Sequence, residues 1–370
     1  MRAAKSNPRP ASKSRWRARA DALARLVPSG RLHPAVLSWA NGRPADERWA
    51  VAFSGGADSV ALLLLVWSHW PARRKRICVL HFDHRLRGAA SRADAAFCRK
   101  VCRSLGIEFA AGAWPAVPAR GRTGMRRVSE AEARAARFAF FAREMRVRRI
   151  RALWMGHQRD DVAETLLMRL ARGSGAGGLA APRPVQAGPQ GRIHVRPLLD
   201  LAKSEIIRAL RAAGAPWRED ATNAGGGYFR NRIRNSVIPA WSRAAGRDAL
   251  AGAAHSRELL EEDDSALEKW VDRLKPVTPG GKLDVRQMAD QPRALARRAL
   301  HRWLLRIKGS DRLSRPGFEA LLSAVQRGRP ARQSLGADGF ARIRGKWLLF
   351  ERCKTKRRPR GGIFGPANGC

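Results

Sequence analysis

The chain has 370 residues, more than one hydrophobic core usually serves, so two or three domains are expected. Its 73 lysines and arginines outnumber 31 acidic residues, and the formal charge of +42 favours a polyanionic partner such as nucleic acid over a purely small-molecule function. The most apolar stretch, residues 60–67, is far shorter than the roughly 20 residues of a membrane span. Five cysteines without a C-x-x-C pair suggest neither a disulfide framework nor a zinc or iron–sulfur site, so a cytoplasmic protein without a membrane partner is expected.

The start of the chain is strongly basic. No acidic residue precedes Asp21, and prolines interrupt the first ten residues. We therefore expect a disordered basic arm and a lead-in helix over residues 1–45, ahead of a first domain at residues 46–240.

A glycine-rich turn follows the first apolar strand. It reads Ser54-Gly55-Gly56-Ala57-Asp58-Ser59, and an apolar helix is expected from residue 59 to residue 69. Adjacent glycines let the backbone turn its N–H groups toward an anion, and the helix directs its positive end to the same place. The turn lacks the lysine of a Walker P-loop but contains Asp58, a carboxylate suited to Mg²⁺. An ordinary strand-to-helix turn would explain Gly-Gly alone, whereas the full string favours a nucleotide-phosphate site.

Strands and helices alternate through the rest of this domain. Strands are expected at residues 77–82, 107–110, 152–155 and 193–195, and helices at residues 91–105, 129–145, 160–170 and 203–213. Ser129 and Glu132 stand at capping-box spacing. The alternation predicts an α/β fold with a doubly wound, mostly parallel sheet, whose ligands lie beyond the carboxyl ends of the strands. The glycine-rich turn and residues 81–85 and 156–161 would then meet in one crevice.

Three carboxylates gather at the start of one predicted helix. Asp160 and Glu164 are four residues apart and Asp161 is three residues from Glu164, so one helical face can carry all three. Acids favoured by the helix dipole would explain the cluster if it stood alone. Beside a phosphate loop it becomes a candidate for binding Mg²⁺, for holding an ammonium group, or for accepting a proton from an attacking amine.

An arginine-rich strip ends the first domain. It consists of Arg230, Arg232 and Arg234 beside Tyr228 and Phe229. Arginines can hold RNA phosphates and an aromatic ring can stack an unpaired base. The alternative is a solvated basic face with Tyr228 in the core.

The C-terminal third shows helical spacing of apolar residues at 247–274, 293–307 and 316–326. A smaller, mainly helical domain is therefore expected over residues 241–330. Two apolar runs around Gly345 predict a short β-hairpin region at residues 331–352. Residues 353–370 contain no acid and several prolines and glycines, so a disordered basic tail is expected.

A series of strings, in order, indicates a known family. The strings are S-G-G-A-D-S from Ser54, H-F-D-H-R-L-R from His81, E-A-E-A-R-A-A-R-F from Glu130, G-H-Q-R-D-D-V-A-E-T from Gly156, R-G-S-G from Arg172, R-P-L-L from Arg196, and E-D-A-T-N with Y-F-R-N-R-I-R between Glu219 and Arg234. Together they resemble the tRNA(Ile)-lysidine synthetases, members of the PP-loop ATP pyrophosphatase superfamily, over residues 48–240. The chain departs from that pattern at Phe138, where tyrosine is usual, and at Gln158, which replaces a second histidine.

The resemblance implies a reaction and a set of residue roles. ATP would adenylate the C2 oxygen of the wobble cytidine, C34, of a CAU-anticodon tRNA(Ile), and free L-lysine would displace AMP to form lysidine. The resemblance makes residues 241–330 a tRNA-binding domain and leaves homodimer formation open. The residues that would bind ATP are Ser54 to Ser59, His81, His84 and Arg134; those for Mg²⁺ are Asp58 and Asp161; those for lysine are Asp160 and Glu164.

Two other kinds of protein share parts of this pattern. A PP-loop tRNA thiolase replaces the same type of oxygen with sulfur, but such enzymes usually employ cysteine pairs, and no C-x-x-C is present. A noncatalytic RNA-binding protein on the same fold would explain the charge but not the retained carboxylates. The residues therefore favour the lysine ligase.

Overall fold

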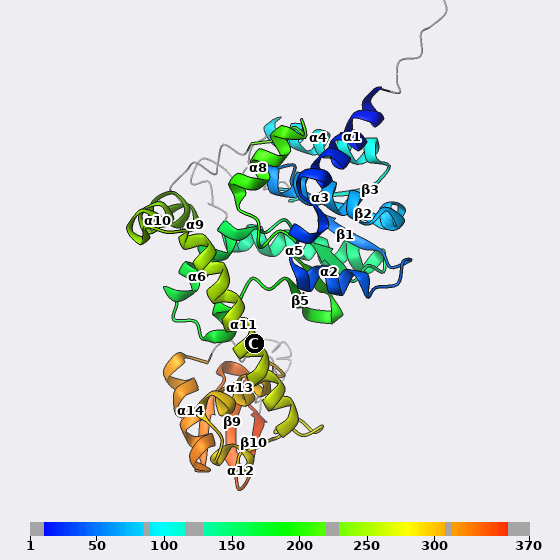
Figure 1. Ribbon diagram of the computed structural model, residues 1–370. Coiled ribbons are helices and arrows are strands. Elements are labelled where there is room, and N and C mark those ends of the chain that lie inside the picture. Colours follow the sequence, from blue (N-terminus) through cyan, green and yellow to red (C-terminus); the bar gives the residue numbers. More distant parts are fainter. Residues whose placement is uncertain (1–10, 85–88, 115–128, 220–228, 308–312, 354–370) are drawn as a thin grey trace, which may run out of the picture. The chain divides into compact units, whose positions relative to one another are not determined.

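The computed structural model describes residues 11–84, 89–114, 129–219, 229–307 and 313–353 (Figure 1). Tyr228, residues 85–87 and the predicted tail beyond residue 353 lie outside the described residues. The chain divides into two compact units, Met1–Glu261 and Glu262–Cys370, and each is described by itself. Among the described residues, no helix combines the length and the apolar character that crossing a bilayer requires. The five-part division predicted from sequence, with its assigned roles, stays a prediction.

The first unit is built on a six-stranded sheet with the order β3-β2-β1-β4-β6-β5. All strand pairs are parallel except β5 with β6, which is antiparallel. The predicted α/β fold with a mostly parallel sheet is confirmed. The strands are β1 (Trp49–Ala52), β2 (Ile77–Asp83), β3 (Glu108–Ala113), β4 (Ala152–Trp154), β5 (Val185–Ala187) and β6 (Ile193–Val195).

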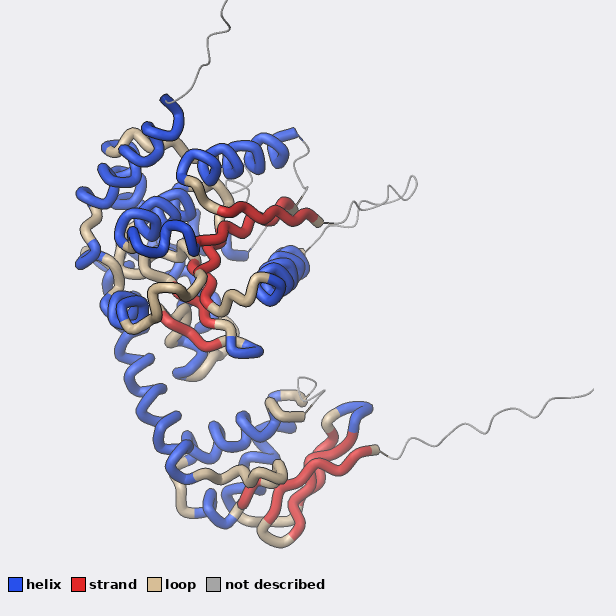
Figure 2. Tube along the Cα trace, turned by 90° about the vertical axis from the view of Figure 1, so that its right-hand side faces the viewer, coloured by secondary structure: helices blue, strands red, loops and turns tan. Residues whose placement is uncertain are grey.

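Helices cover both faces of this sheet, as Figure 2 shows. Val51 of β1 packs in a core with helices α1 (Ala11–Leu26), α3 (Ala57–His69) and α4 (Ala89–Leu105), whereas its neighbour Ala50 packs against α5 (Glu130–Val147) on the opposite face. Successive strand residues point to opposite faces, so a strand buried on both sides must be apolar throughout. The short, continuous apolar runs of β1 and β2 follow from this requirement.

Helix α5 begins at a capping box, and further helices complete the first unit. Ser129 accepts from the Glu132 N–H and Glu132 accepts from the Ser129 N–H, so the predicted capping box at the start of α5 is confirmed. The α-helices and the π-helix are α2 (Pro34–Asn41), α6 (Arg159–Leu170), α7 (Ala176–Leu179), α8 (Lys203–Ala212), α9 (Phe229–Arg232), the π-helix Ile233–Val237, α10 (Ile238–Ala245) and α11 (Ala249–Leu274), which continues into the second unit.

The basic start of the chain contains helix α1, which the structure describes from Ala11 to Leu26. Trp16, Ala20 and Leu23 lie on its buried side, at helical spacing, and pack against α3 and α4. The apolar stripe therefore docks this helix even though arginines fill its other face.

The second unit combines helices with a four-stranded antiparallel sheet of order β7-β10-β9-β8. The expectation of a mainly helical C-terminal domain was wrong, because helical periodicity reveals apolar helix faces but not the sheet that covers them. The predicted hairpin around Gly345 is confirmed as β9 and β10. The elements are β7 (Leu283–Asp284), α12 (Arg286–Ala289), α13 (Arg293–Leu304), α14 (Arg315–Arg327), β8 (Ala331–Ser334), β9 (Gly339–Arg344) and β10 (Trp347–Arg352).

Candidate active site

The glycine-rich turn between β1 and α3 is held by its own hydroxyl groups. The Ser59 hydroxyl accepts from the Gly55 N–H at 3.1 Å and donates to the Gly56 carbonyl at 2.9 Å. The Ser54 hydroxyl accepts from the Gly56 N–H at 3.3 Å. Gly55 has φ +90°, a conformation that side chains rarely adopt, and an added Cβ would lie 3.0 Å from the Cys98 sulfur. The turn is therefore a fixed loop at the N-terminus of α3.

Asp58 lies in the first turn of α3 and is the carboxylate closest in sequence to this loop. Its Oδ1 atom is buried and has no hydrogen-bond partner among the described residues. Burial raises the pKa of Asp58 to about 6, and the neighbouring Asp161 adds to the rise while Lys203 opposes it. A buried carboxylate oxygen without a partner is unfavourable by itself, so this atom is suited to a cation ligand.

Gly156 brings the end of β4 against the same loop. A Cβ at Gly156 would lie 2.8 Å from the Asp58 carbonyl oxygen, closer than real Cβ atoms approach. Only glycine allows this contact between the two backbones. The predicted meeting of the stretches at residues 54–59 and 156–161 is therefore present in the structure.

His81 joins the end of β2 to the loop. Its Nδ1 lies 2.8 Å from the Phe53 carbonyl oxygen, so Nδ1 carries the proton and donates to it. Burial lowers the pKa of His81, and its Nε2 is buried with no hydrogen-bond partner among the described residues. Neutral His81 therefore offers Nε2 as an unused acceptor. Its other nitrogen is bonded to Phe53, the residue directly before the phosphate loop.

His84 and Arg134 are set among aromatic rings. The His84 ring is 4.9 Å from that of Phe82, and burial lowers the pKa of His84. The Arg134 guanidinium lies over the Phe138 ring at 4.7 Å. Phe138, the residue that replaces the usual tyrosine, thus serves as a stacking surface for a cation.

The start of α6 orders two of the three predicted carboxylates. Gln158 is the N-cap of α6: its side chain accepts from the Asp160 N–H at 2.5 Å, and its own N–H donates to Asp161 Oδ2 at 3.1 Å. Asp160 Oδ2 accepts from the backbone N–H of Lys203 at 3.0 Å, at the start of α8. Asp160 therefore links two helix N-termini, and the charges of Asp161 and Asp160 both contribute to the raised pKa of Asp58.

Glu164 is fully buried and is held by two arginines of the sequence-predicted strip. Arg230 Nε donates to Glu164 Oε2 at 2.6 Å, and Arg234 Nε donates to Glu164 Oε1 at 2.5 Å. Arg230 also donates to Asp161 Oδ1 at 2.7 Å. A buried carboxylate requires this kind of compensation. Of the strip proposed to face RNA, the structure directs Arg230 and Arg234 to these carboxylates, whereas Arg232 is exposed beside Phe229.

Residues 34–241 match the family model described as a PP-loop domain. A tRNA(Ile)-lysidine synthase of Chlorobaculum tepidum is 34% identical over 80% of this chain and 90% of that protein. The chain belongs to the tRNA(Ile)-lysidine synthase family. The synthase of Symbiobacterium thermophilum is 37% identical over 76% of this chain and 59% of that protein, and that of Solibacter usitatus is 39% identical over 62% and 49%. The chain thus spans only about half to three-fifths of the length of these two relatives.

Among solved structures, a U34-tRNA thiolase from Methanococcus maripaludis aligns with a TM-score of 0.48 and 15% identity, over 68% of this chain and 80% of that chain. The likeness is too distant to bear on function.

Several residues of this family member complete the site without having been singled out from the sequence. Arg196 donates from Nε to His157 Nδ1 at 3.1 Å, and burial together with this arginine lowers the pKa of His157 well below its usual value. The Arg218 N–H donates to the Gly55 carbonyl at 2.9 Å, and its side chain pairs with Asp94 at 2.7 Å. The R-P-L-L string contained the signal for Arg196, but no local pattern marks Arg218.

Proposed function

We propose that this chain ligates lysine to C2 of the wobble cytidine, C34, in a CAU-anticodon tRNA(Ile), through an adenylated cytidine, with release of pyrophosphate and AMP. The observation that carries the proposal is the meeting of the phosphate loop, His81 and the carboxylates of α6 beyond the carboxyl ends of β1, β2 and β4. An ATP whose phosphates lie on the loop would place its α-phosphate where an RNA oxygen could attack it. Membership of the lysidine synthase family supplies the identity of the two other substrates.

The ATP phosphates would be bound at the N-terminus of α3. The N–H groups of Gly55 and Gly56 donate to the hydroxyls of Ser59 and Ser54, so phosphate would have to displace these hydroxyls to use them. His81, His84 and Arg134 would lie beside the nucleotide. Loss of pyrophosphate develops negative charge on the leaving group, and the positive end of α3 would stabilise that charge.

Asp58 is the residue best fitted to hold Mg²⁺, since its buried Oδ1 has no competing partner among the described residues. Asp161 would be the second ligand, but its Oδ1 is engaged by Arg230 and would have to be released. When bound, Mg²⁺ would neutralise part of the charge on the departing pyrophosphate.

Lysine would bind at Asp160 and Glu164, the residues that the resemblance implies. Glu164 is fully buried and both of its oxygens accept from Arg230 or Arg234, so lysine would reach it only if these arginines moved, whereas Asp160 is only partly buried. Free lysine carries an α-carboxylate as well as two amino groups, so a cluster of two acids and two arginines matches its charges. The α-ammonium would pair with a carboxylate and the α-carboxylate with an arginine, which leaves the ε-amine to attack C2. A nearby carboxylate would accept the proton that the amine loses.

The tRNA backbone would follow a basic groove along α4. Four exposed cationic side chains line this groove together with Asp83, which ends β2: Arg92, Arg99, Lys100 and Arg103. They lie on one helical face over about 16 Å, from a rise of about 1.5 Å per residue. Such a strip attracts phosphates without reading sequence, so it would guide the anticodon arm toward the nucleotide.

Sulfur transfer is disfavoured by the three cysteines that the structure describes in the first unit. Cys78, Cys98 and Cys102 are buried, and burial raises the pKa of Cys78 and of Cys98 to about 12. A thiolase needs a reactive thiolate or an iron–sulfur ligand set, and a thiol in apolar surroundings supplies neither.

The proposal is tested by incubating the protein with ATP, Mg²⁺, labelled lysine and transcripts of CAU-anticodon tRNA(Ile) and elongator tRNA(Met). Label should enter only the isoleucine transcript and be retained after denaturation. Equal labelling of the methionine transcript would refute the selectivity, and no labelling of either would refute the ligase.

A further inference from the structure

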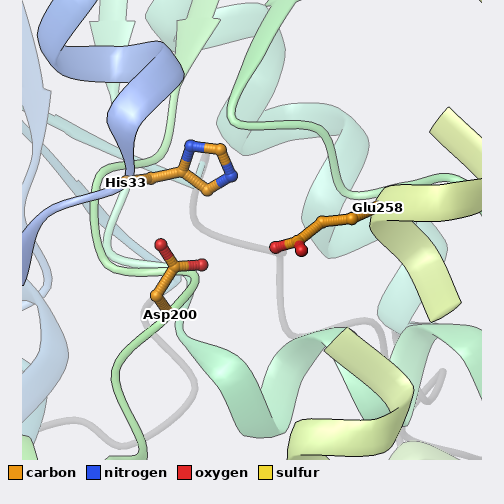
Figure 3. Close-up of side chains that lie close together, drawn as sticks. All are labelled: His33, Asp200 and Glu258. Atoms are coloured by element: carbon orange, nitrogen blue, oxygen red, sulfur yellow. The ribbon is translucent and has the colours of Figure 1, made fainter. Parts of the chain in front are cut away.

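Three potential metal ligands converge in the first unit, away from the phosphate loop. His33 precedes α2, Asp200 follows β6, and Glu258 lies on α11; one ligand atom of each is within 4.8 Å of the others. Figure 3 shows the three side chains directed toward the same space from three separate elements. We propose that these residues form a binding site for a divalent transition-metal ion, with Zn²⁺ as the best match. One imidazole and two carboxylates are ligands that Zn²⁺ accepts, and three protein ligands leave one position for water.

The unsatisfied nitrogen of His33 is the observation that separates this cluster from an ordinary group of acids. His33 is only 9% exposed, and its Nε2 is buried with no hydrogen-bond partner among the described residues. Its Nδ1 accepts from the Ala35 N–H at 3.2 Å, so the ring is anchored by one nitrogen while the other faces the carboxylates. Buried polar atoms are rarely left unpaired, and coordination would satisfy this one.

The anchoring bond has a consequence for metal binding. With Nδ1 accepting from Ala35, the neutral ring carries its proton on Nε2. A metal ion must take the Nε2 lone pair, so the proton moves to Nδ1 and the bond from the Ala35 N–H is given up. Losing a capping bond of this kind weakens affinity by roughly tenfold.

The charges around the cluster also suit a divalent cation. Asp200 is half-buried, and Arg257 and Arg159 are the cations that act on its carboxylate. Arg257, almost fully buried, forms its close ion pair with Glu261 and lies 3.6 Å from Glu258. Since Glu261 counters Arg257 and Asp248 pairs with Arg159 at 3.2 Å, the carboxylates of Asp200 and Glu258 remain for the metal ion.

A bound ion would hold together three segments that are distant in sequence. Asp200 lies in the connection from β6 to α8, and the first residue of α8, Lys203, donates its backbone N–H to Asp160 of the candidate active site. The site would thus brace this connection. Its role would be structural, so the proposal does not depend on the lysine-ligase activity.

The test is a titration of metal-free, full-length protein with Zn²⁺ by isothermal calorimetry, in a chain whose two C-terminal cysteines, Cys353 and Cys370, are replaced by serine. The expected result is one site per chain. A Zn²⁺ concentration about 100 times Kd should raise the unfolding temperature by about 5 °C.

Matched variants identify the ligands. His33→Asn removes Nε2 but retains an oxygen that can cap α2, so it should fold and bind Zn²⁺ at least tenfold more weakly; Asp200→Asn should do the same. His255→Asn changes an exposed histidine three residues from Glu258 and should leave binding unaltered. The proposal is overturned if the parent protein binds no Zn²⁺, or if His33→Asn and Asp200→Asn both bind as the parent does.

Discussion

At the scale of single residues, Asp58 is the most informative side chain. Its carboxylate is largely buried beside the phosphate loop, and burial raises its pKa to about 6 from an ordinary value of 3.8. Because the folded state binds this proton more tightly than the unfolded state, Asp58 lowers stability as the pH rises from about 4 to about 6. Such a destabilising carboxylate is expected where a ligand supplies the missing compensation.

Replacing Asp58 with asparagine should separate stability from activity. Asp58→Asn removes an uncompensated charge, so the unfolding temperature at pH 7.5 should stay level or rise, while lysine transfer should fall at least 100-fold and tRNA retention should persist.

The raised pKa of Asp58 also predicts a pH dependence. In the parent protein kcat/KM for lysine transfer should decline below pH 6, and added Mg²⁺ should shift that decline to lower pH. Loss of tRNA retention in the variant, or a pH profile indifferent to Mg²⁺, would contradict this role.

Gly156 makes a second prediction at this scale. Gly156→Ala forces a Cβ to within 2.8 Å of the Asp58 carbonyl, where backbone rather than a flexible side chain must move. We expect a loss of about 1–3 kcal/mol in the free energy of unfolding and weaker ATP binding. Gly252→Ala is the control, since nothing lies within 4 Å of its added Cβ in α11 and alanine favours helix. Chemical denaturation that finds the two variants equally stable would disprove the close contact.

At the scale of elements, α6 and the segment from α9 into the π-helix form one ion-paired unit. Glu164 has no exposed surface and depends on Arg230 and Arg234, which are four residues apart. Arg232, between them, is exposed. The sequence alone predicted three equivalent arginines for RNA, because the segment's helical conformation and the position of α6 are both tertiary information.

Substitutions along this segment should therefore differ sharply. Arg234→Gln should lower the free energy of unfolding by about 3 kcal/mol, because it leaves a buried carboxylate partly uncompensated. Arg232→Gln should change it by less than about 0.5 kcal/mol. Urea denaturation of the two variants measures the difference, and similar values for both would mean that the pairs to Glu164 are not formed in solution.

Helix α4 offers a test of the proposed tRNA path. Changing Arg99, Lys100 and Arg103 to alanine removes three cations from the groove, and should weaken tRNA binding and reduce its salt dependence by about three units of slope, since each phosphate contact contributes roughly one. The control removes three cations from the opposite end of β2: Arg74, Lys75 and Arg76, in a 3-10 segment, Pro71–Arg76. If filter binding finds equal losses for both triple variants, the overall charge rather than this groove attracts the tRNA.

At the scale of the whole molecule, the first unit was more predictable than the second. The apolar strands at residues 77–82 and 152–155 are buried on both faces, so composition alone marked them, and glycine marked the loop between strand and helix. Strand β7 has two residues and β8 reads Ala-Arg-Gln-Ser, so neither contains a local signal. Their sheet exists because it covers the apolar faces of α13 and α14, as Leu300 and Leu322 pack with Ile343.

The candidate active site also contains residues that the sequence revealed and residues that it did not. Local patterns revealed the loop, His81 and the acids of α6, since each stands at the end of a strand. The partners that complete these groups, such as Arg218 beside Gly55 and Lys203 beside Asp160, come from distant segments whose positions only the folded chain provides.

We propose above all that a tRNA oxygen attacks the α-phosphate of ATP in one nucleotide pocket of the first unit, which breaks the bond between the α- and β-phosphates. The most direct measurement follows α-labelled ATP by chromatography with tRNA(Ile) transcript, with and without lysine. We expect AMP as the only free nucleotide product, released stoichiometrically with lysidine when lysine is present. Formation of ADP, or AMP release that is independent of tRNA, would contradict it.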